Sequence, residues 1–356
     1  MDKKIEKHSN EECTQPSEHF NANNSLESSL KDAKIDFNRM IDATSTSTSE
    51  VLQEFIPTTE IKGMEDFIPE SNYYAYYDQS SNSNVKIERE FDIDFPENLN
   101  VYSYEIGNNS SFESPKKGST GVFNYYLMDG GSLLPVLALD LRPNTTFLDI
   151  CAAPGGKSML ALQTLYPNII TSNDCSKSRV DRIYNVYKQF IFDFDEKFLK
   201  TGKVVLSQRD GRFIKNDTYD RILVDVPCTT DRHSLKENDN NIFKPSRIKE
   251  RLKLPELQSE LLFNALKLVN KGGIVVYSTC TLSPIQNDGV VHIVLKRICE
   301  ESNMKIIIKD ISPALLQARS LFKLASPKLM RYGHLVLPCS TQNFGPTYFC
   351  KLQRIE

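Results

Sequence analysis

The chain has 356 residues, of which 40% are hydrophobic, so it can form one large domain or two smaller ones with a sizeable core. Its net charge of −3 is unevenly distributed: residues 1–120 hold 11 Lys+Arg and 23 Asp+Glu, and residues 121–356 hold the remaining 32 and 23. A basic C-terminal part is compatible with a polyanionic partner, although an ordinary solvated surface explains it equally well. The eight cysteines form no C-x-x-C pair, and neither a secretory signal nor a run of about 18 apolar residues is visible. We therefore expect free thiols, no metal site and no membrane span.

Residues 1–60 are rich in Ser, Thr, Asn and Glu. We expect this segment to be disordered, because it cannot bury enough apolar area to offset its ordering entropy. It is also unlike a mitochondrial presequence, which is normally rich in Arg and poor in acidic residues. Residues 61–120 hold several tyrosines among many loop residues, and we expect this N-terminal extension to pack on a main domain at 121–356.

From residue 121 onward, short β-rich runs alternate with helical runs. The strand candidates are nearly continuous in apolar residues, which predicts a doubly wound, mostly parallel α/β sheet. The expected strands are 146–151, 169–174, 204–208, 221–226, 273–279, 304–308 and 347–352. The expected helices are 132–139, 157–165, 176–190, 254–269 and 287–300.

A glycine-rich turn follows the first expected strand, in the run Asp149-Ile150-Cys151-Ala152-Ala153-Pro154-Gly155-Gly156-Lys157. Glycines let the backbone approach a ligand, and a helix that starts near Lys157 offers free amides, so the turn predicts a nucleotide-type cofactor site. A phosphate-binding P-loop would need glycine at position 151, and the dinucleotide fingerprint G-x-G-x-x-G is absent. The remaining interpretation is a site for S-adenosylmethionine.

Acidic residues at the ends of the next two strands fit this interpretation. Asp174, about 18 residues past the turn, is placed to hold ribose hydroxyls. Asp210, followed by Gly211, is placed to meet the adenine amine. Each acid alone is more often a strand-end cap, but with Asp149 there are acids at three successive strand ends, which favours the cofactor.

Two cysteines follow the fourth and fifth expected strands: Cys228 in Asp225-Val226-Pro227-Cys228, and Cys280 in Tyr277-Ser278-Thr279-Cys280. Methylation of cytosine at C5 needs a thiolate that adds to C6, because the ring then becomes an enamine-like nucleophile. An acid such as Asp225 near N3 assists the addition by neutralising charge that develops on the ring. The residues alone leave open which thiol attacks. A lone cysteine is more often a packing residue, and we expect that of Cys151, Cys299, Cys339 and Cys350.

Six blocks of sequence resemble those of a known family. They are Tyr125–Asp129, Leu148–Lys157, Val224–Leu235, Asn241–Lys244, Val275–Cys280 and Asn343–Lys351. Over residues 121–356, about two thirds of the chain, these blocks resemble the Sun-domain (NOL/NOP/Sun) RNA cytosine-5 methyltransferases, and most closely their mitochondrial ribosomal-RNA branch. The Val224–Leu235 and C-terminal blocks look specific to that branch. One departure is Gly130-Gly131, where small residues such as alanine are expected.

The resemblance implies a catalytic domain with a Rossmann-like class I S-adenosylmethionine-dependent methyltransferase fold and a seven-stranded sheet. It implies formation of 5-methylcytosine in mitochondrial small-subunit ribosomal RNA, a role in mitoribosome assembly and a mitochondrial transcription-termination-factor-like partner that supplies RNA affinity. Cys280 is then the nucleophile, Cys228 the second thiol that assists product release, and Asp225 a third catalytic residue. The implied cofactor residues are Gly155, Gly156, Lys157, Ser158, Asp174, Arg179, Asp210, Gly211 and Asp225.

Two other functions compete with this interpretation. A catalytically silent scaffold need not retain both cysteines and Asp225. An amino-group methyltransferase prefers Asn/Asp-Pro-Pro-Tyr at the fourth strand end, where Asp-Val-Pro-Cys stands. A basic run close to the cysteine block either contacts RNA or forms a solvated helix face. That run comprises Lys244, Arg247, Lys249, Arg251 and Lys253.

Overall fold

The computed structural model describes residues 85–108, 110–341 and 344–356. The expectations for residues 1–84 lie outside this part of the chain. The strands are β1 (Ile87–Arg89), β2 (Thr146–Asp149), β3 (Ile169–Asn173), β4 (Val204–Ser207), β5 (Tyr219–Asp225), β6 (Val269–Thr279), β7 (Ile306–Asp310), β8 (His334–Val336) and β9 (Thr347–Arg354). The α-helices are α4 (Leu133–Ala138), α5 (Gly156–Gln163), α6 (Lys177–Phe190), α7 (Asp231–Lys236), α8 (Ile248–Leu268) and α9 (Val290–Glu301).

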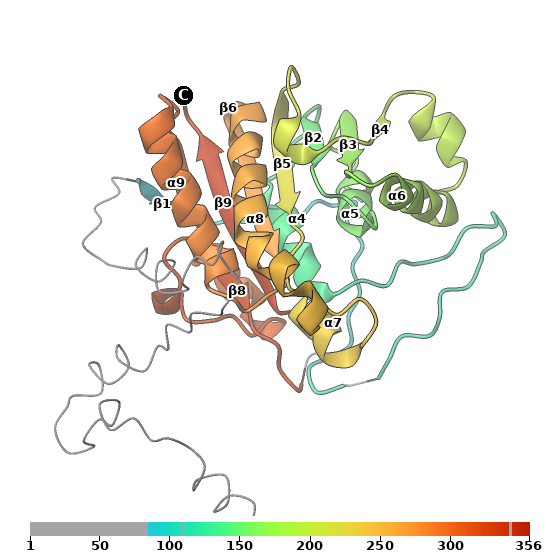
Figure 1. Cartoon of the computed structure of the whole chain (residues 1–356). Helices are drawn as coiled ribbons and strands as arrows, with labels where there is room; N and C mark the ends of the chain where they lie inside the picture. The colour runs from blue at the N-terminus through green and yellow to red at the C-terminus, as the bar shows by residue number, and fades with distance from the viewer. Residues whose placement is uncertain (1–84, 109, 342–343) are drawn as a thin grey trace, which may run out of the picture. The chain divides into compact units, whose positions relative to one another are not determined.

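The strands form one sheet in the order β1-β7-β9-β6-β5-β2-β3-β4, with β8 paired to β9 (Figure 1). Strands β4, β3, β2, β5 and β6 are parallel, whereas β9 lies antiparallel between β6 and β7. The strand order reverses at β2, because β3 and β4 follow on one side of it and β5 and β6 on the other. The carboxyl end of β2 is therefore a topological switch point, where α/β sheets bind ligands.

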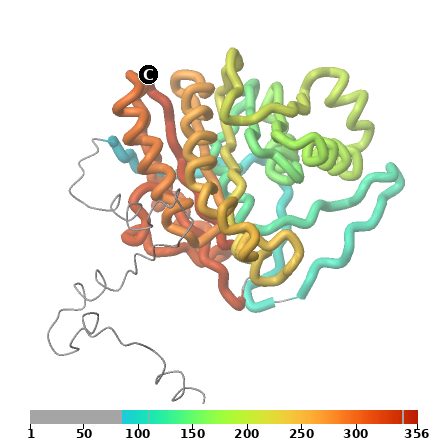
Figure 2. Tube along the Cα trace, viewed as in Figure 1, coloured from blue at the N-terminus to red at the C-terminus, as the bar shows by residue number. Residues whose placement is uncertain are grey.

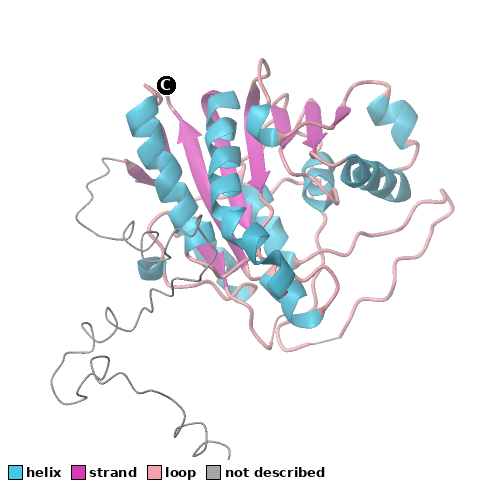
Figure 3. Ribbon diagram, viewed as in Figure 1, coloured by secondary structure: helices cyan, strands magenta, loops and turns pink. Residues whose placement is uncertain are grey.

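Alternate residues of the central strands feed two hydrophobic cores, one on each face of the sheet. Phe147 of β2 and Leu223 of β5 pack with α4, α5 and α6, whereas Leu148 and Ile222 pack with α8 and α9. Because successive strand residues point to opposite faces, nearly continuous apolar strands need helices on both sides. Figure 3 shows these strands in magenta among the cyan helices.

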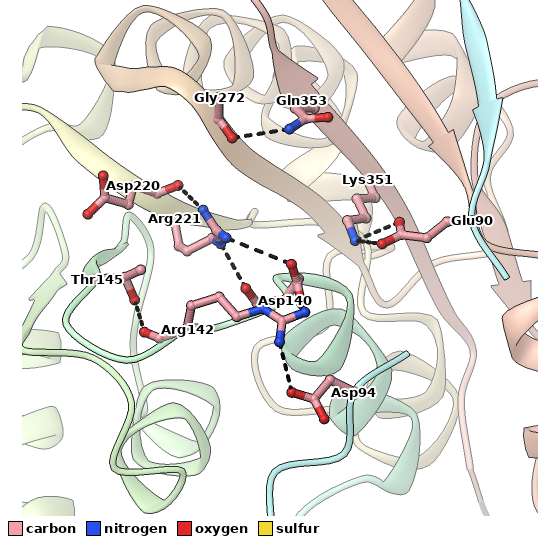
Figure 4. Close-up of polar contacts among 10 residues, drawn as sticks. All are labelled: Glu90, Asp94, Asp140, Arg142, Thr145, Asp220, Arg221, Gly272, Lys351 and Gln353. Atoms are coloured by element: carbon pink, nitrogen blue, oxygen red, sulfur yellow. Dashed lines mark hydrogen bonds and ion pairs between the residues drawn. The ribbon is translucent and has the colours of Figure 1, made fainter. Parts of the chain in front are cut away.

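Residues 85–108 attach to the sheet through β1 and through acidic side chains. Strand β1 pairs in parallel with β7, and the carboxylate of Glu90 lies 2.7 Å from the buried ammonium of Lys351 on β9 (Figure 4). Asp94 pairs with Arg142, ahead of β2, at 3.2 Å. Burial lowers the pKa of Lys351, and the Glu90 carboxylate opposes that shift. The division of the chain at residues 60 and 120 stays a prediction.

Residues 110–126 form a long irregular loop that returns to α6 (Figure 2). The backbone N–H of Phe123 donates to the carbonyl of Gln189 at 2.8 Å, and the ring of Tyr126 meets Phe190 edge-on, with 5.0 Å between centroids. The loop thereby carries Tyr126 to the glycine turn.

The structure confirms the expected mostly parallel α/β sheet. All seven expected strands are present, and β1 and β8 enlarge the sheet within the described residues. Helix α7 was not expected, and α8 begins at Ile248, ahead of the expected start at Leu254. Pro255 lies inside this helix, although proline is typical of a helix start. No helix of the described residues combines the length and the apolar character that a membrane crossing requires.

Candidate active site

The turn between β2 and α5 has two positions that require glycine. Gly155 has a φ of +111°, a conformation that L side chains rarely adopt. A Cβ on Gly156 would lie 2.8 Å from a ring carbon of Tyr126. The amides that open α5 follow at once, and a helix N-terminus favours polar and negative groups. The turn predicted from the sequence therefore has the local geometry of a ligand-binding turn.

Asp149 and Ser158 support this turn from beneath. Both side chains are buried, and the Ser158 hydroxyl donates to Oδ2 of Asp149 at 2.6 Å. Burial raises the pKa of Asp149 to about 7, although the hydrogen bond from Ser158 opposes that shift. Ser158 thus turns its hydroxyl toward the last residue of β2.

The acids after β3 and β4 are held by arginines. Asp174 is buried, lies 3.1 Å from Arg179 and accepts the backbone N–H of Ser176. Asp210 caps a short 3-10 turn, η5 (Gly211–Phe213), and both of its oxygens contact the guanidinium of Arg212. Hydrogen bonding from the Arg212 side chain holds the pKa of Asp210 below its usual value. The adenine contact expected of Asp210 stays a prediction.

The residues at these strand ends fit S-adenosylmethionine. Each oxygen of a carboxylate has two lone pairs, so Asp174 can accept ribose hydroxyls and still keep Arg179. Gly211 lets η5 lie close to the sheet, since a Cβ there would meet Leu261 at 2.7 Å and Ile150 at 2.8 Å. The glycine turn and the Asp174 carboxylate follow adjacent parallel strands, where one ligand reaches both.

Cys228 and Cys280 lie side by side at the carboxyl ends of β5 and β6. The pairing of Asp225 with Ser278 brings the two loops together, and the two sulfurs are 3.1 Å apart. Cys228 is buried and Cys280 is exposed. The thiol of Cys280 donates to Cys228 and so lowers the pKa of Cys228, while the same contact raises the pKa of Cys280 well above its usual value. When one thiol of the pair ionises, the negative charge is favoured on the buried sulfur of Cys228.

An ion pair joins the glycine turn to the thiols. Lys157 Nζ lies 2.7 Å from one oxygen of Asp225, and the Ser278 hydroxyl donates to the other oxygen at 2.7 Å. Burial lowers the pKa of Lys157, but the charge and the hydrogen bond of Asp225 outweigh burial, so the pKa of Lys157 is raised. The ammonium also favours the thiolate form of Cys280. Because Lys157 belongs to α5, one side chain links the cofactor turn to the thiol pair.

Polar side chains hold the loops that carry the thiols. The Thr229 hydroxyl donates to that of Thr281 at 2.7 Å, which joins the residues that follow the two cysteines. Asp231 accepts hydrogen bonds from Thr281 at 3.1 Å and from the N–H of Leu282 at 2.8 Å. Its own N–H donates to the carbonyl of Cys280 at 3.2 Å. Helix α7 therefore begins directly beside Cys280.

Asp129 joins three segments that are far apart in the sequence, at a contact that we call the Asp129 junction. Its Oδ2 accepts from Arg232 of α7 at 2.8 Å, and its Oδ1 accepts the N–H of Gly131 at 2.8 Å and of Gly345 at 3.1 Å. Asp129 was not among the residues expected at the site. The usable signal was that three of the six family-like blocks contain Asp129, Arg232 and Gly345.

The other cysteines differ in burial. Cys350 is buried, whereas Cys339 and Cys151 are half-buried. Cys151 packs against the core next to the glycine turn. The expectation of burial is wrong for Cys299, which is exposed because it lies in the last turn of α9, beyond the buried Ile298. The described residues hold no cluster of three or more His, Cys, Asp or Glu suited to a metal ion.

Several known proteins are similar to this chain in sequence. Residues 136–330 match the family described as 16S rRNA methyltransferase RsmB/F. The "5-cytosine rRNA methyltransferase NSUN4" of Mus musculus is 44% identical over 74% of this chain and 68% of its own length. The protein of that name from Xenopus tropicalis is also 44% identical, over 72% of this chain and 63% of its own length. The Mus musculus "tRNA (cytosine(34)-C(5))-methyltransferase, mitochondrial" is 36% identical over 73% of this chain and 72% of its own length.

A solved structure described as NSun6 from Pyrococcus horikoshii with SFG has a TM-score of 0.53 and 23% identity, and the match covers 69% of this chain and 57% of that chain. This likeness concerns the fold, which is the Rossmann-like fold of S-adenosylmethionine-dependent methyltransferases. The chain belongs to the RsmB/F family of RNA methyltransferases, which confirms the Sun-domain resemblance noted in its sequence.

Proposed function

We propose that this protein is an S-adenosylmethionine-dependent RNA (cytosine-5)-methyltransferase that forms 5-methylcytosine in ribosomal RNA. The observation that carries the proposal is the 3.1 Å contact between the sulfurs of Cys228 and Cys280, beside the Lys157–Asp225 ion pair. The family supports it, because relatives at 44% identity are named 5-cytosine rRNA methyltransferases. Neither a silent scaffold nor an amino-group methyltransferase has a use for this thiol pair.

Cys280 is the nucleophile, because it is the exposed thiol of the pair. As its sulfur forms a bond to cytosine C6, its proton passes to the sulfur of Cys228, on which the negative charge is favoured. The Lys157–Asp225 pair lies beside the thiols and stabilises the charge that the addition places on the ring. S-adenosylmethionine supplies the electrophilic methyl group that C5 accepts.

Release restores the thiol pair. The proton on C5 leaves to solvent, the bond between C6 and the Cys280 sulfur breaks, and the aromatic ring re-forms. Cys228 then returns its proton to Cys280, so the net products are 5-methylcytosine, S-adenosylhomocysteine and one proton. The 3.1 Å separation lets both proton transfers occur without an intervening group.

The cofactor cradle runs along the carboxyl ends of β2, β3, β4 and β5. The turn residues approach the cofactor through the backbone, Asp174 takes the ribose hydroxyls, and Arg179 orients Asp174. We assign to this cradle Gly155, Gly156, Lys157, Ser158, Asp174, Arg179, Asp210, Gly211 and Asp225.

We place the protein in mitochondria, acting on small-subunit ribosomal RNA during mitoribosome assembly. A mitochondrial transcription-termination-factor-like protein is the proposed partner. The support is the family resemblance and a relative whose name carries the word mitochondrial. Bisulfite sequencing of organellar and cytoplasmic RNA after depletion tests this: loss of 5-methylcytosine from mitochondrial ribosomal RNA supports it, whereas loss from cytoplasmic RNA alone overturns it.

Methyl transfer from labelled S-adenosylmethionine to ribosomal RNA tests the proposed chemistry. Cys280→Ala should abolish transfer and leave cofactor binding near normal, because the thiol touches the base rather than the cofactor. Cys299→Ala is the matched control, since it removes an exposed cysteine from another part of the chain. Normal turnover by Cys280→Ala would rule out Cys280 as the nucleophile.

A further inference from the structure

An exposed aromatic ring lies on the loop that connects α7 to α8. Phe243 is 50% exposed, and the guanidinium of Arg251 lies over its ring, 5.2 Å from the ring centroid. Arg251 thus backs the ring with a cation and leaves half of the side chain to solvent. The pair has the composition of a nucleotide-stacking surface, because bases stack on aromatic rings and arginine adds a cation–π contribution.

The loop that carries this ring is held by its own hydrogen bonds. Asn241 donates to the carbonyl of Ser234 at 2.6 Å and accepts the backbone N–H of Phe243 at 2.9 Å. Arg247 donates to the carbonyl of Asn240 and also pairs with a glutamate on α8. Phe243 is therefore presented on a fixed loop, and ordering its backbone on binding costs little.

A short chain of contacts connects the ring to the thiols. The hydroxyl of Ser234 donates to the carbonyl of Thr229, the residue after Cys228, and α7 begins beside Cys280. Because Asn241 contacts Ser234, Phe243 lies roughly 10–20 Å from the two sulfurs. A few nucleotides of extended single strand bridge that distance.

The same segment is basic. It covers a short 3-10 turn, η6 (Pro245–Arg247), and the first turns of α8, and its exposed cations are Lys244, Lys249 and Lys253. Lysines beside an aromatic ring suit a phosphodiester chain whose bases are unpaired. The exposed ring favours RNA contact over a merely solvated helix face for this basic run.

We propose that Phe243, backed by Arg251, is a stacking platform for an unpaired nucleotide that lies within a few positions of the target cytosine. The proposal rests on the proposed function, because it takes RNA as the substrate. A cytosine that reaches the thiols has left its stack, so a neighbouring base has lost a partner that an aromatic ring replaces. The preferred substrate is therefore RNA that is single-stranded around the target.

Fluorescence anisotropy with a labelled single-stranded RNA that contains cytosine, and with its duplex, tests the platform. Phe243→Ala should weaken single-strand binding about five- to a hundredfold and leave duplex binding unchanged. Phe243→Trp should bind like the wild type, whereas Phe243→Leu, which is apolar but cannot stack, should bind like Phe243→Ala. Phe192→Ala is the matched control: Phe192 is also 50% exposed and lies under a cation, Lys197, at 4.7 Å. That variant should bind single strands normally.

Calorimetry with S-adenosylmethionine checks that each variant keeps its fold. If Phe243→Ala loses cofactor binding, the comparison of Phe243→Leu with Phe243→Trp decides instead. Equal single-strand affinity of these two variants, or of Phe243→Ala and the wild type, overturns the platform. If the wild type binds RNA but transfers no methyl group, the proposed function fails. The binding assay still tests the platform in that case, because it measures RNA affinity and not methyl transfer.

Discussion

The Asp129 junction should contribute measurably to stability and to the position of Cys280. Asp129→Asn removes the charge but keeps the size of the side chain. The new amide can still accept the N–H groups of Gly131 and Gly345, but its Nδ2 then faces the guanidinium of Arg232, donor against donor. The variant therefore isolates the charged contact at 2.8 Å.

The exposure of the two side chains sets the magnitude. A hydrogen bond between charged groups contributes about 1.5–3 kcal/mol, and an exposed ion pair about 0.2–1 kcal/mol. Asp129 and Arg232 have side chains that are 30% and 27% exposed, so we expect a loss of about 1–2 kcal/mol in the free energy of unfolding. The variant Asp129→Asn/Arg232→Gln should show a coupling energy of about 1 kcal/mol, because an amide pair replaces the mismatch.

Urea unfolding followed by circular dichroism measures this loss, since the chain contains no tryptophan. Methyl-transfer kinetics should show that kcat falls about tenfold while the KM for RNA changes little, because Arg232 holds the helix that begins beside Cys280. The matched control is Glu113→Gln, which neutralises an exposed partner of Lys116 at the same 2.8 Å and should cost at most about 0.5 kcal/mol.

Three results would contradict this reasoning in whole or in part. A loss in Asp129→Asn no larger than that in Glu113→Gln would mean that the junction behaves as an ordinary surface ion pair. Strict additivity in the double variant would mean that Asp129 and Arg232 act independently. A fall in stability with unchanged kcat would confine Asp129 to a structural role.

Four further predictions follow from the site and from the attachment of residues 85–108. Cys228→Ala should accumulate a covalent RNA–protein adduct through the remaining thiol, seen as a slower band on a denaturing gel; absence of the band contradicts the assigned roles. Asp174→Ala should weaken S-adenosylmethionine binding about ten- to a hundredfold in calorimetry, and unchanged affinity would move the ribose contact elsewhere. The pKa of Asp149 is raised to about 7, so the folded protein keeps a proton that the unfolded chain releases at about pH 4. The free energy of unfolding of the wild type therefore falls as the pH rises between these two values. Asp149→Asn should therefore gain about 3 kcal/mol relative to the wild type between pH 5 and pH 8, and parallel pH profiles would exclude this burial effect. Glu90→Ala leaves the ammonium of Lys351 buried without its carboxylate and should cost about 2 kcal/mol, less than a fully buried pair because the Glu90 side chain is 31% exposed; an unchanged denaturation midpoint contradicts this.

Local signals explain why much of the site was visible in the sequence. The run from Asp149 to Lys157 combines a strand end, two glycines and a helix start, and each part has a local physical cause. The Pro-Cys frame at Cys228 and the apolar run before Cys280 placed both thiols at strand ends. Helix α7 was missed because its six residues are too few to show a helical period.

The sequence by itself determined the elements, the turn and the residue types of the site, because helix and strand periods, glycine geometry and thiol chemistry act over short stretches. Only the tertiary structure brought Cys228 within 3.1 Å of Cys280, 52 residues away, and Lys157 within 2.7 Å of Asp225, 68 residues away. The Asp129 junction spans still longer separations. An apolar strand has the same pattern whichever neighbour it pairs with, so strand order and register decide which side chains meet. The directions of the thiol and carboxyl pKa shifts depend on burial and on those neighbours, and for that reason they appear only in the folded chain.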